Sequence, residues 1–469
     1  MKKFYLMLFA GSLAITALAQ EKFESGRPNN ADYRYLDGYK ALKEYIDYSK
    51  YPNFKLGIGT SVPEYLQKST VYKLTNKNFT ETVAGNAMKM ASCVNGNGDM
   101  NFETVKKYVK EATDAGLSVY GHTLAWHSQQ PIGWLTKLIA GPLTQQEKHD
   151  ALVNAMDRWI KGMMEACGGQ VKAFDLVNEA IGGGGNDGSG NYTLQHSDDY
   201  NPNGNPDATW DVGGSAFYWQ DYMGDLEYVR QACRLARKYG PEDVVLFIND
   251  YNLESDWDDN KKVKSLVNWI KKWESDGVTR IDGIGTQMHI SCFESTTHQN
   301  SIKKHITQMF EIIAKSGKLC RVSEMDMGYV RGSDRWASSV KTDQLTEAEH
   351  KKMADLYEWI IKEYLRIIPP SQQWGICQWC TTDSPSGSGW RGGEPVGLWD
   401  LNYYRKHTYA GFVRGLNGGE PTAIGQAEAD KTATAPCAIY TLSGVRLQAT
   451  SPDDLPSGLY IVNGKKVIK

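Results

Sequence analysis

The stretch Ala173-Phe174-Asp175-Leu176-Val177-Asn178-Glu179 is a short, mostly apolar run that ends in two polar residues. A run of this length, flanked by polar residues, is typical of a buried strand. The same arrangement recurs along the chain, because other short apolar runs also read as strands. Together with residues 173–177, the expected strands are 54–59, 79–83, 117–120, 244–248, 283–286, 319–322 and 373–379.

Stretches with helical spacing separate these strands, and residues 102–115 and 357–367 are clear examples. Eight strands that alternate with helices between residues 31 and 417 predict an α/β fold, a (β/α)₈ TIM barrel. A doubly wound open sheet is the alternative. The barrel is favoured because nearly every strand ends in a polar cluster, and a barrel brings all its carboxyl strand ends to one site.

These clusters contain the residue types expected of a functional site rather than of a packed core. A cap or a salt bridge would explain one cluster, but a row of them on one rim predicts a single site. In chain order they are Asn86-Ala87-Met88-Lys89, residues 121–129, Asn178-Glu179, Asn249-Asp250-Tyr251-Asn252, Gln287-Met288-His289, Ser323-Glu324-Met325-Asp326, and the tryptophans Trp374, Trp379 and Trp390.

Glu179 and Glu324 end the fourth and seventh expected strands, so they would face each other across the barrel mouth. Two carboxyl groups, one protonated and one ionised, are the minimum for cleaving a glycosidic bond. Asn178 could hydrogen-bond a sugar 2-hydroxyl. His289 and Asp326 would keep Glu324 ionised, which leaves Glu179 as the group with the raised pKa. The alternative is that both glutamates form strand-end salt bridges.

The composition agrees with a carbohydrate-binding groove. The 469 residues include 14 Trp and 26 Tyr but only 12 Phe. Amphipathic rings suit the flat face and hydroxyl rim of a sugar, although a tyrosine-rich core is an equally simple explanation. The net charge of −3 gives no electrostatic reason to expect nucleic acid or an anionic membrane surface as a partner. Nothing indicates an oligomer, so we expect a monomer.

The two ends of the chain differ from the middle. Residues 1–19 combine a basic start, a short apolar run and Ala17-Leu18-Ala19, which predicts a signal peptide and export to the periplasm, cell surface or medium. No later run is long enough to insert into a membrane. Residues 418–436 read as a linker. Residues 437–469 read as a small β segment, in which Asn463-Gly464 predicts a hairpin turn.

Several motifs together resemble glycoside hydrolase family 10, the xylanases. The resemblance rests on 121–131, 175–180, 249–252, 282–289 and 322–326, in order and at family-like spacing. It implies a (β/α)₈ endo-glycosidase on β-1,4-xylan that retains anomeric configuration and needs no metal or cofactor, and the expected signal peptide would make this enzyme a secreted one. The segment 437–469 resembles part of a sorting domain of the type IX secretion system of Bacteroidetes.

By matching position, Glu179 would be the acid/base and Glu324 the nucleophile, with Asp326 in support. The resemblance also implies a set of residues that bind the sugars or line the site around them. These are Asn86, Lys89, His122, Trp126, Gln129, Asn178, Gln287, His289, Trp374 and Trp390.

Two departures from the family pattern bear on specificity. Gly85 stands where the family has a glutamate that binds a glycone-side hydroxyl, and we expect Gly85→Glu to improve action on plain xylo-oligosaccharides. The polar stretch 182–214 follows Glu179 and could form part of the aglycone-side wall. The alternatives to plain xylan are therefore a decorated or mixed-linkage xylan, or another β-glycan. A non-hydrolysing carbohydrate-binding protein is disfavoured because both glutamates are present.

Overall fold

The computed structural model describes residues 21–198, 200 and 216–416, and the backbone of four short strands between residues 439 and 468. It contains two compact units, Met1–Gly419 and Glu420–Lys469. The expected signal peptide and linker, and residues 199 and 201–214 of the polar stretch 182–214, lie outside the described residues.

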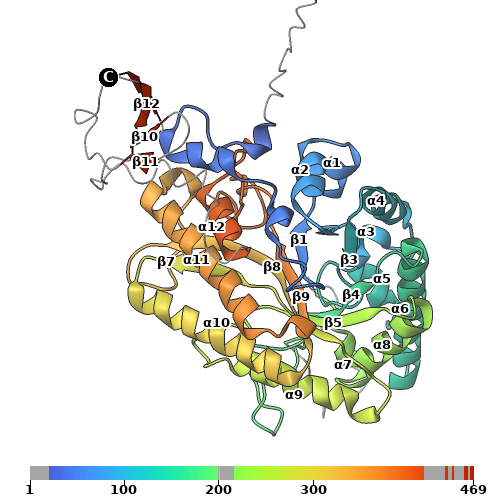
Figure 1. Ribbon diagram of the computed structural model, residues 1–469. Coiled ribbons are helices and arrows are strands. Elements are labelled where there is room, and N and C mark those ends of the chain that lie inside the picture. The colour runs from blue at the N-terminus through green and yellow to red at the C-terminus, as the bar shows by residue number, and fades with distance from the viewer. Residues whose placement is uncertain are drawn as a thin grey trace, which may run out of the picture. The chain divides into compact units, whose positions relative to one another are not determined.

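The first unit is a closed barrel of eight parallel strands, which confirms the predicted (β/α)₈ fold (Figure 1). The barrel closes where β6 pairs with β8, with Gly283 opposite Leu319 and Thr286 opposite Val322. In order around the barrel the strands are β1 (Lys55–Gly59), β2 (Glu81–Val83), β3 (Ser118–Gly121), β4 (Ala173–Asn178), β5 (Val245–Asp250), β6 (Gly283–Thr286), β8 (Leu319–Val330) and β9 (Gln373–Gln378).

One further strand, β7 (His289–Phe293), lies outside the barrel and was not predicted. It runs parallel to the second half of β8, from His289 opposite Asp326 to Phe293 opposite Val330. The seventh expected strand ends at residue 322, because Ser323, Glu324 and Asp326 break its apolar pattern. In the structure β8 continues for eight more residues because its polar side chains are buried among partners rather than exposed.

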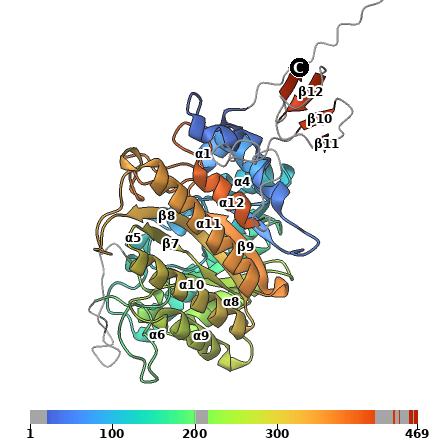
Figure 2. The same cartoon turned by 60° about the vertical axis from the view of Figure 1, so that its left-hand side comes forward.

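Helices cover the outside of the barrel, and Figures 1 and 2 both show α10 beside α11. The helix expected at 357–367 begins ten residues earlier, because Thr346 and Glu349 form a capping box that starts α11 at Glu347. The helices are α1 (Val62–Leu66), α2 (Thr70–Asn78), α3 (Met90–Cys93), α4 (Glu103–Asp114), α5 (Ile132–Leu138), α6 (Gln145–Cys167), α7 (Trp219–Met223), α8 (Glu227–Tyr239), α9 (Lys261–Trp273), α10 (Thr296–Ser316), α11 (Glu347–Ile367) and α12 (His407–Leu416). Within the described residues, none of these helices combines the length and apolar character needed to cross a membrane.

A buried ion pair fills the barrel interior. Arg321 of β8 donates to Glu81 of β2 across the barrel at 2.8 Å, and both side chains are at most 3% exposed. The guanidinium also lies over the ring of Tyr120, 3.7 Å from its centroid. Trp374 donates its indole N–H to the other oxygen of Glu81. This pair ties opposite strands of the barrel together.

The second unit contains an antiparallel sheet of four strands in the order β11-β10-β12-β13. Strands β12 and β13 pair from Leu459 opposite Ile468 to Val462 opposite Lys465, so they flank Asn463-Gly464 as the hairpin prediction requires. The bounds are β10 (Ile439–Thr441), β11 (Arg446–Leu447), β12 (Leu459–Val462) and β13 (Lys465–Ile468).

The buried pair gives a stability prediction. Arg321→Met leaves the Glu81 carboxylate buried without its cation, so we expect the free energy of unfolding to fall by about 3–5 kcal/mol in denaturant titrations. The double variant Glu81→Gln/Arg321→Met should recover part of that loss because no charge stays buried. Lys110→Ala, which breaks the exposed pair with Asp114, is the control and should change little. A single Arg321 variant as stable as this control would contradict the interpretation.

Candidate active site

Glu179 follows the end of β4 and is held by both its backbone and its side chain. Its amide N–H donates to the carbonyl of Asn249 at 2.7 Å, and its φ of 57° lies in the left-handed region. One carboxyl oxygen accepts from the indole N–H of Trp126 at 3.0 Å. The other accepts from Gln287 at 2.9 Å and from Asn178 at 3.2 Å. The carboxyl group is therefore fixed in place at the barrel mouth.

Glu324 lies within β8 and is 6% exposed. It accepts from the Asn249 amide at 2.8 Å, and its second oxygen lies 3.4 Å from Nε2 of His289. Burial alone would raise the pKa of Glu324. The hydrogen bonds from His289 and Asn249 and the charges of His289 and His122 outweigh burial and hold this pKa well below its ordinary value. Glu324 is thus held in its ionised form.

His289 lies between two carboxylates. Its Nδ1 lies 3.1 Å from Asp326, and its Nε2 faces Glu324. Burial would lower the pKa of His289, but the carboxylates of Asp326 and Glu324 raise it above its ordinary value. Asp326 is itself buried and bound by Arg391 at 2.7 Å and by the Trp390 indole at 2.8 Å. The cationic groups around Asp326 and Glu324 explain why two carboxylates stay ionised so close together.

Asn249, at the carboxyl end of β5, joins the two glutamates. Its amide donates both to Glu324 and to the Asn178 oxygen, at 2.8 Å each. Its own oxygen accepts from Ser323 at 2.5 Å, which fixes the orientation of the amide. Asn249 belongs to one of the predicted strand-end clusters but is not among the predicted site residues. The strand-end rule alone would have found it.

His122 is held from below by Asp175, whose carboxylate lies 2.7 Å from Nδ1 of the imidazole and accepts from Tyr120 at 2.6 Å. His127 approaches Glu179 to 3.7 Å and also went unselected. Burial lowers the pKa of His127 to about 4, so this imidazole is neutral near pH 7.

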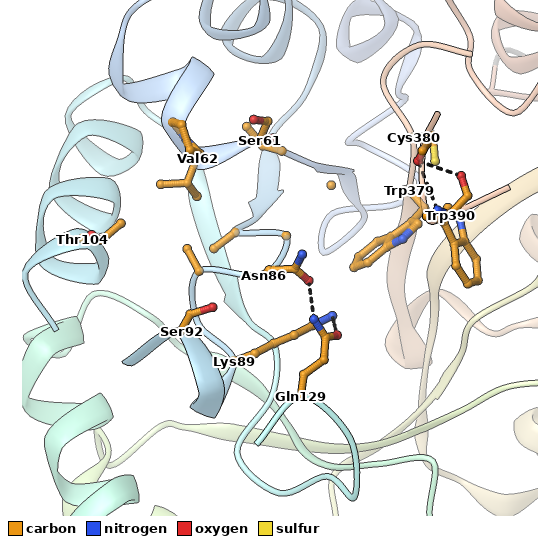
Figure 3. Close-up of a pocket in the computed structure, with 18 residues that line it drawn as sticks. Ser61, Val62, Asn86, Lys89, Ser92, Thr104, Gln129, Trp379, Cys380 and Trp390 are labelled. Carbon is orange, nitrogen blue, oxygen red and sulfur yellow. Dashed lines mark hydrogen bonds between the residues drawn. The ribbon is translucent and has the colours of Figure 1, made fainter. Parts of the chain in front are cut away.

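A cavity of about 910 Å³ opens beside the glutamates, over the loops that follow β1, β2, β3 and β9. Figure 3 shows Asn86, Lys89 and Gln129 on one side of it and the rings of Trp379 and Trp390 on the other. Lys89 donates to Gln129 at 2.6 Å, and Gln129 donates to Asn86 at 3.2 Å. The structure therefore brings these predicted residues together in one wall of donors and acceptors, facing two indole rings.

Trp374 does not lie in this site, so the prediction that it covers bound sugars is wrong. It is the second residue of β9, at the amino end of the strand, and packs inside the barrel against Tyr120 and Phe247. Trp379, five residues later, follows the carboxyl end of β9 and lines the cavity. Trp374 was predicted because residues 374–375 match the family's Trp-Gly dipeptide. The position directly after the carboxyl end of a strand, where the other site residues lie, belongs to Trp379.

Gly85 lines the same cavity and has a φ of +50°. A Cβ atom at this position would lie 3.0 Å from the carbonyl oxygen of Thr60. Any side chain here therefore strains the backbone, by about 1–2 kcal/mol. The expected benefit of Gly85→Glu must be weighed against this strain.

A (β/α)₈ barrel with two glutamates on one rim, of which Glu324 is buried and held ionised and Glu179 is half-buried, and with an indole-flanked polar cavity beside them, defines the protein as a glycoside hydrolase. Nowhere in the described residues do three or more His, Cys, Asp or Glu side chains gather in a metal-binding arrangement. The chain belongs to glycosyl hydrolase family 10, whose family model matches residues 46–414.

Named relatives agree with this assignment. An endo-beta-1,4-xylanase of Cellvibrio japonicus is 27% identical over 404 residues, which are 82% of this chain and 60% of that protein. A thermostable celloxylanase of Thermoclostridium stercorarium is 26% identical over 429 residues, 88% of this chain and 97% of that protein. The native xylanase10C structure of Cellvibrio japonicus has a TM-score of 0.65 at 25% identity and covers 82% of this chain and 74% of that one.

The chain matches only part of some longer relatives. The match to endo-1,4-beta-xylanase A of Thermotoga maritima, at 30% identity, covers 72% of this chain but 27% of that protein. The shared part is the barrel, so the comparison bears on the catalytic unit.

The hydrogen bonds around Glu324 predict how its pKa responds to substitution. His289→Gln and Asn249→Ala each remove an interaction that favours the ionised carboxylate, so the pKa of Glu324 should rise toward the ordinary value of about 4.3. A ¹³C NMR titration of glutamate-labelled protein measures this without any assay of activity. His298→Gln, in α10, is the control. An unchanged pKa in His289→Gln would contradict the assigned role of His289.

Proposed function

We propose that the protein is an endo-1,4-β-xylanase that works by double displacement with retention of configuration. The observation that carries the proposal is the asymmetry of the two glutamates. Glu324 is held ionised by His289 and Asn249. Among the described residues, no cationic side chain lies within hydrogen-bonding distance of Glu179, whose carboxyl group instead faces the indole of Trp126 and two side-chain amides. Xylanase relatives in the same family support the choice of polymer.

In the first step, Glu324 attacks the anomeric carbon as Glu179 donates its proton to the leaving glycosidic oxygen. The bond to that oxygen breaks and a glycosyl ester on Glu324 forms. In the second step, Glu179 takes a proton from a water molecule, which attacks the same carbon and releases Glu324 as a carboxylate. Trp126, Gln287 and Asn178 hold Glu179 in position for both steps.

The cavity beside the glutamates is the proposed glycone site. Asn86, Lys89 and Gln129 would bind sugar hydroxyls, and the rings of Trp379 and Trp390 would cover the opposite face of the sugar. Lys89 is 6% exposed, and burial lowers its pKa while the charges of Glu324 and Glu179 oppose that effect. A hydrogen bond from Lys89 to a sugar hydroxyl would therefore form in a largely desolvated place.

A decorated or otherwise altered β-glycan is the second candidate substrate. It is favoured by Gly85, which leaves the cavity wall without a side chain next to Asn86. The deciding experiment is product analysis after incubating the protein with linear xylan, substituted xylans, a β-glucan and a mannan. Xylo-oligosaccharides from linear xylan support the first candidate, and release only from substituted or other polymers supports the second. If no product is released from any of these polymers, both candidate substrates are wrong.

We also propose that the protein is exported through residues 1–19 as a monomer, with residues 437–469 serving in sorting. The basic, apolar and small-residue sequence of the first segment supports export. Amino-terminal sequencing and mass measurement of protein recovered outside the cytoplasm test the proposal. Retention of residues 1–19 in that protein would contradict it.

The two glutamates should respond differently to substitution. Glu179→Ala removes acid catalysis, so it should lower kcat/KM on xylan by about 10²–10⁴-fold but much less on an aryl β-xylobioside, whose leaving group needs no proton. Glu324→Ala removes the nucleophile and should abolish activity on both substrates. Steady-state kinetics on the two substrates measures the contrast. Equal losses for both variants on the aryl substrate would overturn the assigned roles.

Gly85 variants separate backbone strain from side-chain contacts. Gly85→Ala should lower the melting temperature and leave the preference between linear and substituted xylo-oligosaccharides unchanged. Gly85→Glu carries the same strain but adds a charged acceptor, so relative to Gly85→Ala we expect about a tenfold gain in kcat/KM on linear oligosaccharides. A Gly85→Glu enzyme no better than Gly85→Ala would show that this position does not bind a sugar hydroxyl.

A further inference from the structure

Two exposed tryptophans lie next to each other on the rim of the barrel. Trp257, in the loop between β5 and α9, is 51% exposed, and Trp336, in the loop between β8 and α11, is 70% exposed. Their ring centroids are 5.7 Å apart, with an angle of 57° between the rings. Large apolar side chains are normally buried, so a pair of exposed indoles from two separate loops points to a binding surface.

The pair is held in place by a charged clamp. The guanidinium of Arg335 lies 5.7 Å from the Trp257 ring centroid and 5.1 Å from that of Trp336. Arg335 also makes a two-pronged contact with Asp256, whose side chain is only 1% exposed. The clamp orders both indoles and leaves no net charge beside them, which suits an uncharged, hydroxylated ligand.

A cavity of about 250 Å³ connects the pair to the catalytic centre. Trp257, Trp336 and Arg335 line it at one part, and His289, the partner of Glu324, lines it at another. Glu254 lines it as well, is 3% exposed, and has one carboxyl oxygen without a hydrogen-bond partner among the described residues. A ligand here would meet two indole faces and a buried acceptor for a hydroxyl group.

The position of this cavity in the barrel indicates which part of a polymer would occupy it. The glycone cavity lies over the loops after β1, β2, β3 and β9, whereas this one lies over the loops after β5, β7 and β8. In the closed barrel β9, β1, β2 and β3 form one half of the ring, β4 with Glu179 after it stands between β3 and β5, and β8 with Glu324 stands next to β9. A chain that crosses the catalytic pair from the first cavity runs toward the second.

We propose that Trp257 and Trp336 form a platform that stacks on a sugar ring of the polysaccharide on the aglycone side of the cleaved bond. The inference rests on the proposed endo-xylanase function and extends it by naming a second binding surface. The platform binds the uncharged pyranose ring through its flat face, and the neighbouring Glu254 accepts a hydroxyl hydrogen. It increases the rate on chains long enough to reach it.

The test compares Trp257→Ala, Trp336→Ala and Trp336→Phe with Tyr48→Ala as a matched control. Tyr48 is 43% exposed and precedes β1, at the opposite end of the barrel. Each variant is assayed on xylohexaose and on 4-nitrophenyl β-xylobioside. We expect the ratio of the two kcat/KM values to fall about threefold to tenfold in the alanine variants, and less in Trp336→Phe, which keeps an aromatic face.

Cleavage positions on xylohexaose labelled at its reducing end supply the second readout. Weaker aglycone binding should move cleavage toward the reducing end in the alanine variants. Ratios within twofold of Tyr48→Ala, or a shift toward the non-reducing end, would overturn the platform while leaving the proposed function intact. A wild-type protein that cleaves neither substrate would overturn the proposed function and the platform with it.

Discussion

Closure of the barrel between β6 and β8 is the constraint on which the active site depends. Because β7 is bypassed, Gln287 after β6 and Glu324 in β8 come from neighbouring strands, and Glu324 N–H donates to the Gln287 carbonyl. The pairing of β4 with β5 sets Asn178 directly opposite Asn249. The backbone register of the strands thus sets the positions of the side-chain amides that join the two glutamates. In an open sheet of the same strands, β6 and β8 would lie on separate edges, and Gln287 and Glu324 would be far apart.

Within that frame, the two glutamates differ because of their neighbours. Glu324 is surrounded by groups that favour the charged form, and Asp326 keeps His289 cationic while Arg391 balances Asp326. Glu179 has an indole, two amides and a neutral imidazole around it. Double displacement needs this difference, since one carboxyl group must attack as an anion and the other must carry a proton. The difference comes from the side chains that surround each glutamate rather than from the glutamates themselves.

Much of this arrangement could be predicted from the sequence, because barrel strands buried on both faces leave short apolar runs and their polar ends lie on one rim. The sequence-based prediction was wrong where a strand lacked an apolar run, or where a dipeptide match was preferred to the position of a residue in its strand. The second half of β8 carries buried polar residues, so its length and the pairing of β7 were missed. Trp374 was chosen over Trp379 for a dipeptide match. The position of Asn249 at a strand end was visible in the sequence, but its contact with Glu324 and Asn178 depends on cross-strand register, which no single stretch of sequence contains.

Half of the ten non-glycine residues with positive φ in the described part of the chain lie on the catalytic rim. Gln129, Glu179, Asn252, Met288 and Arg391 all adopt positive φ although none is glycine, and all belong to the catalytic rim. Each such residue gives up about 1–2 kcal/mol relative to an ordinary conformation. The rim is therefore where the fold exchanges stability for reactivity. Selection for heat resistance alone would replace the residues at these positions first. Such replacements would raise the stability of the protein and lower its catalytic activity.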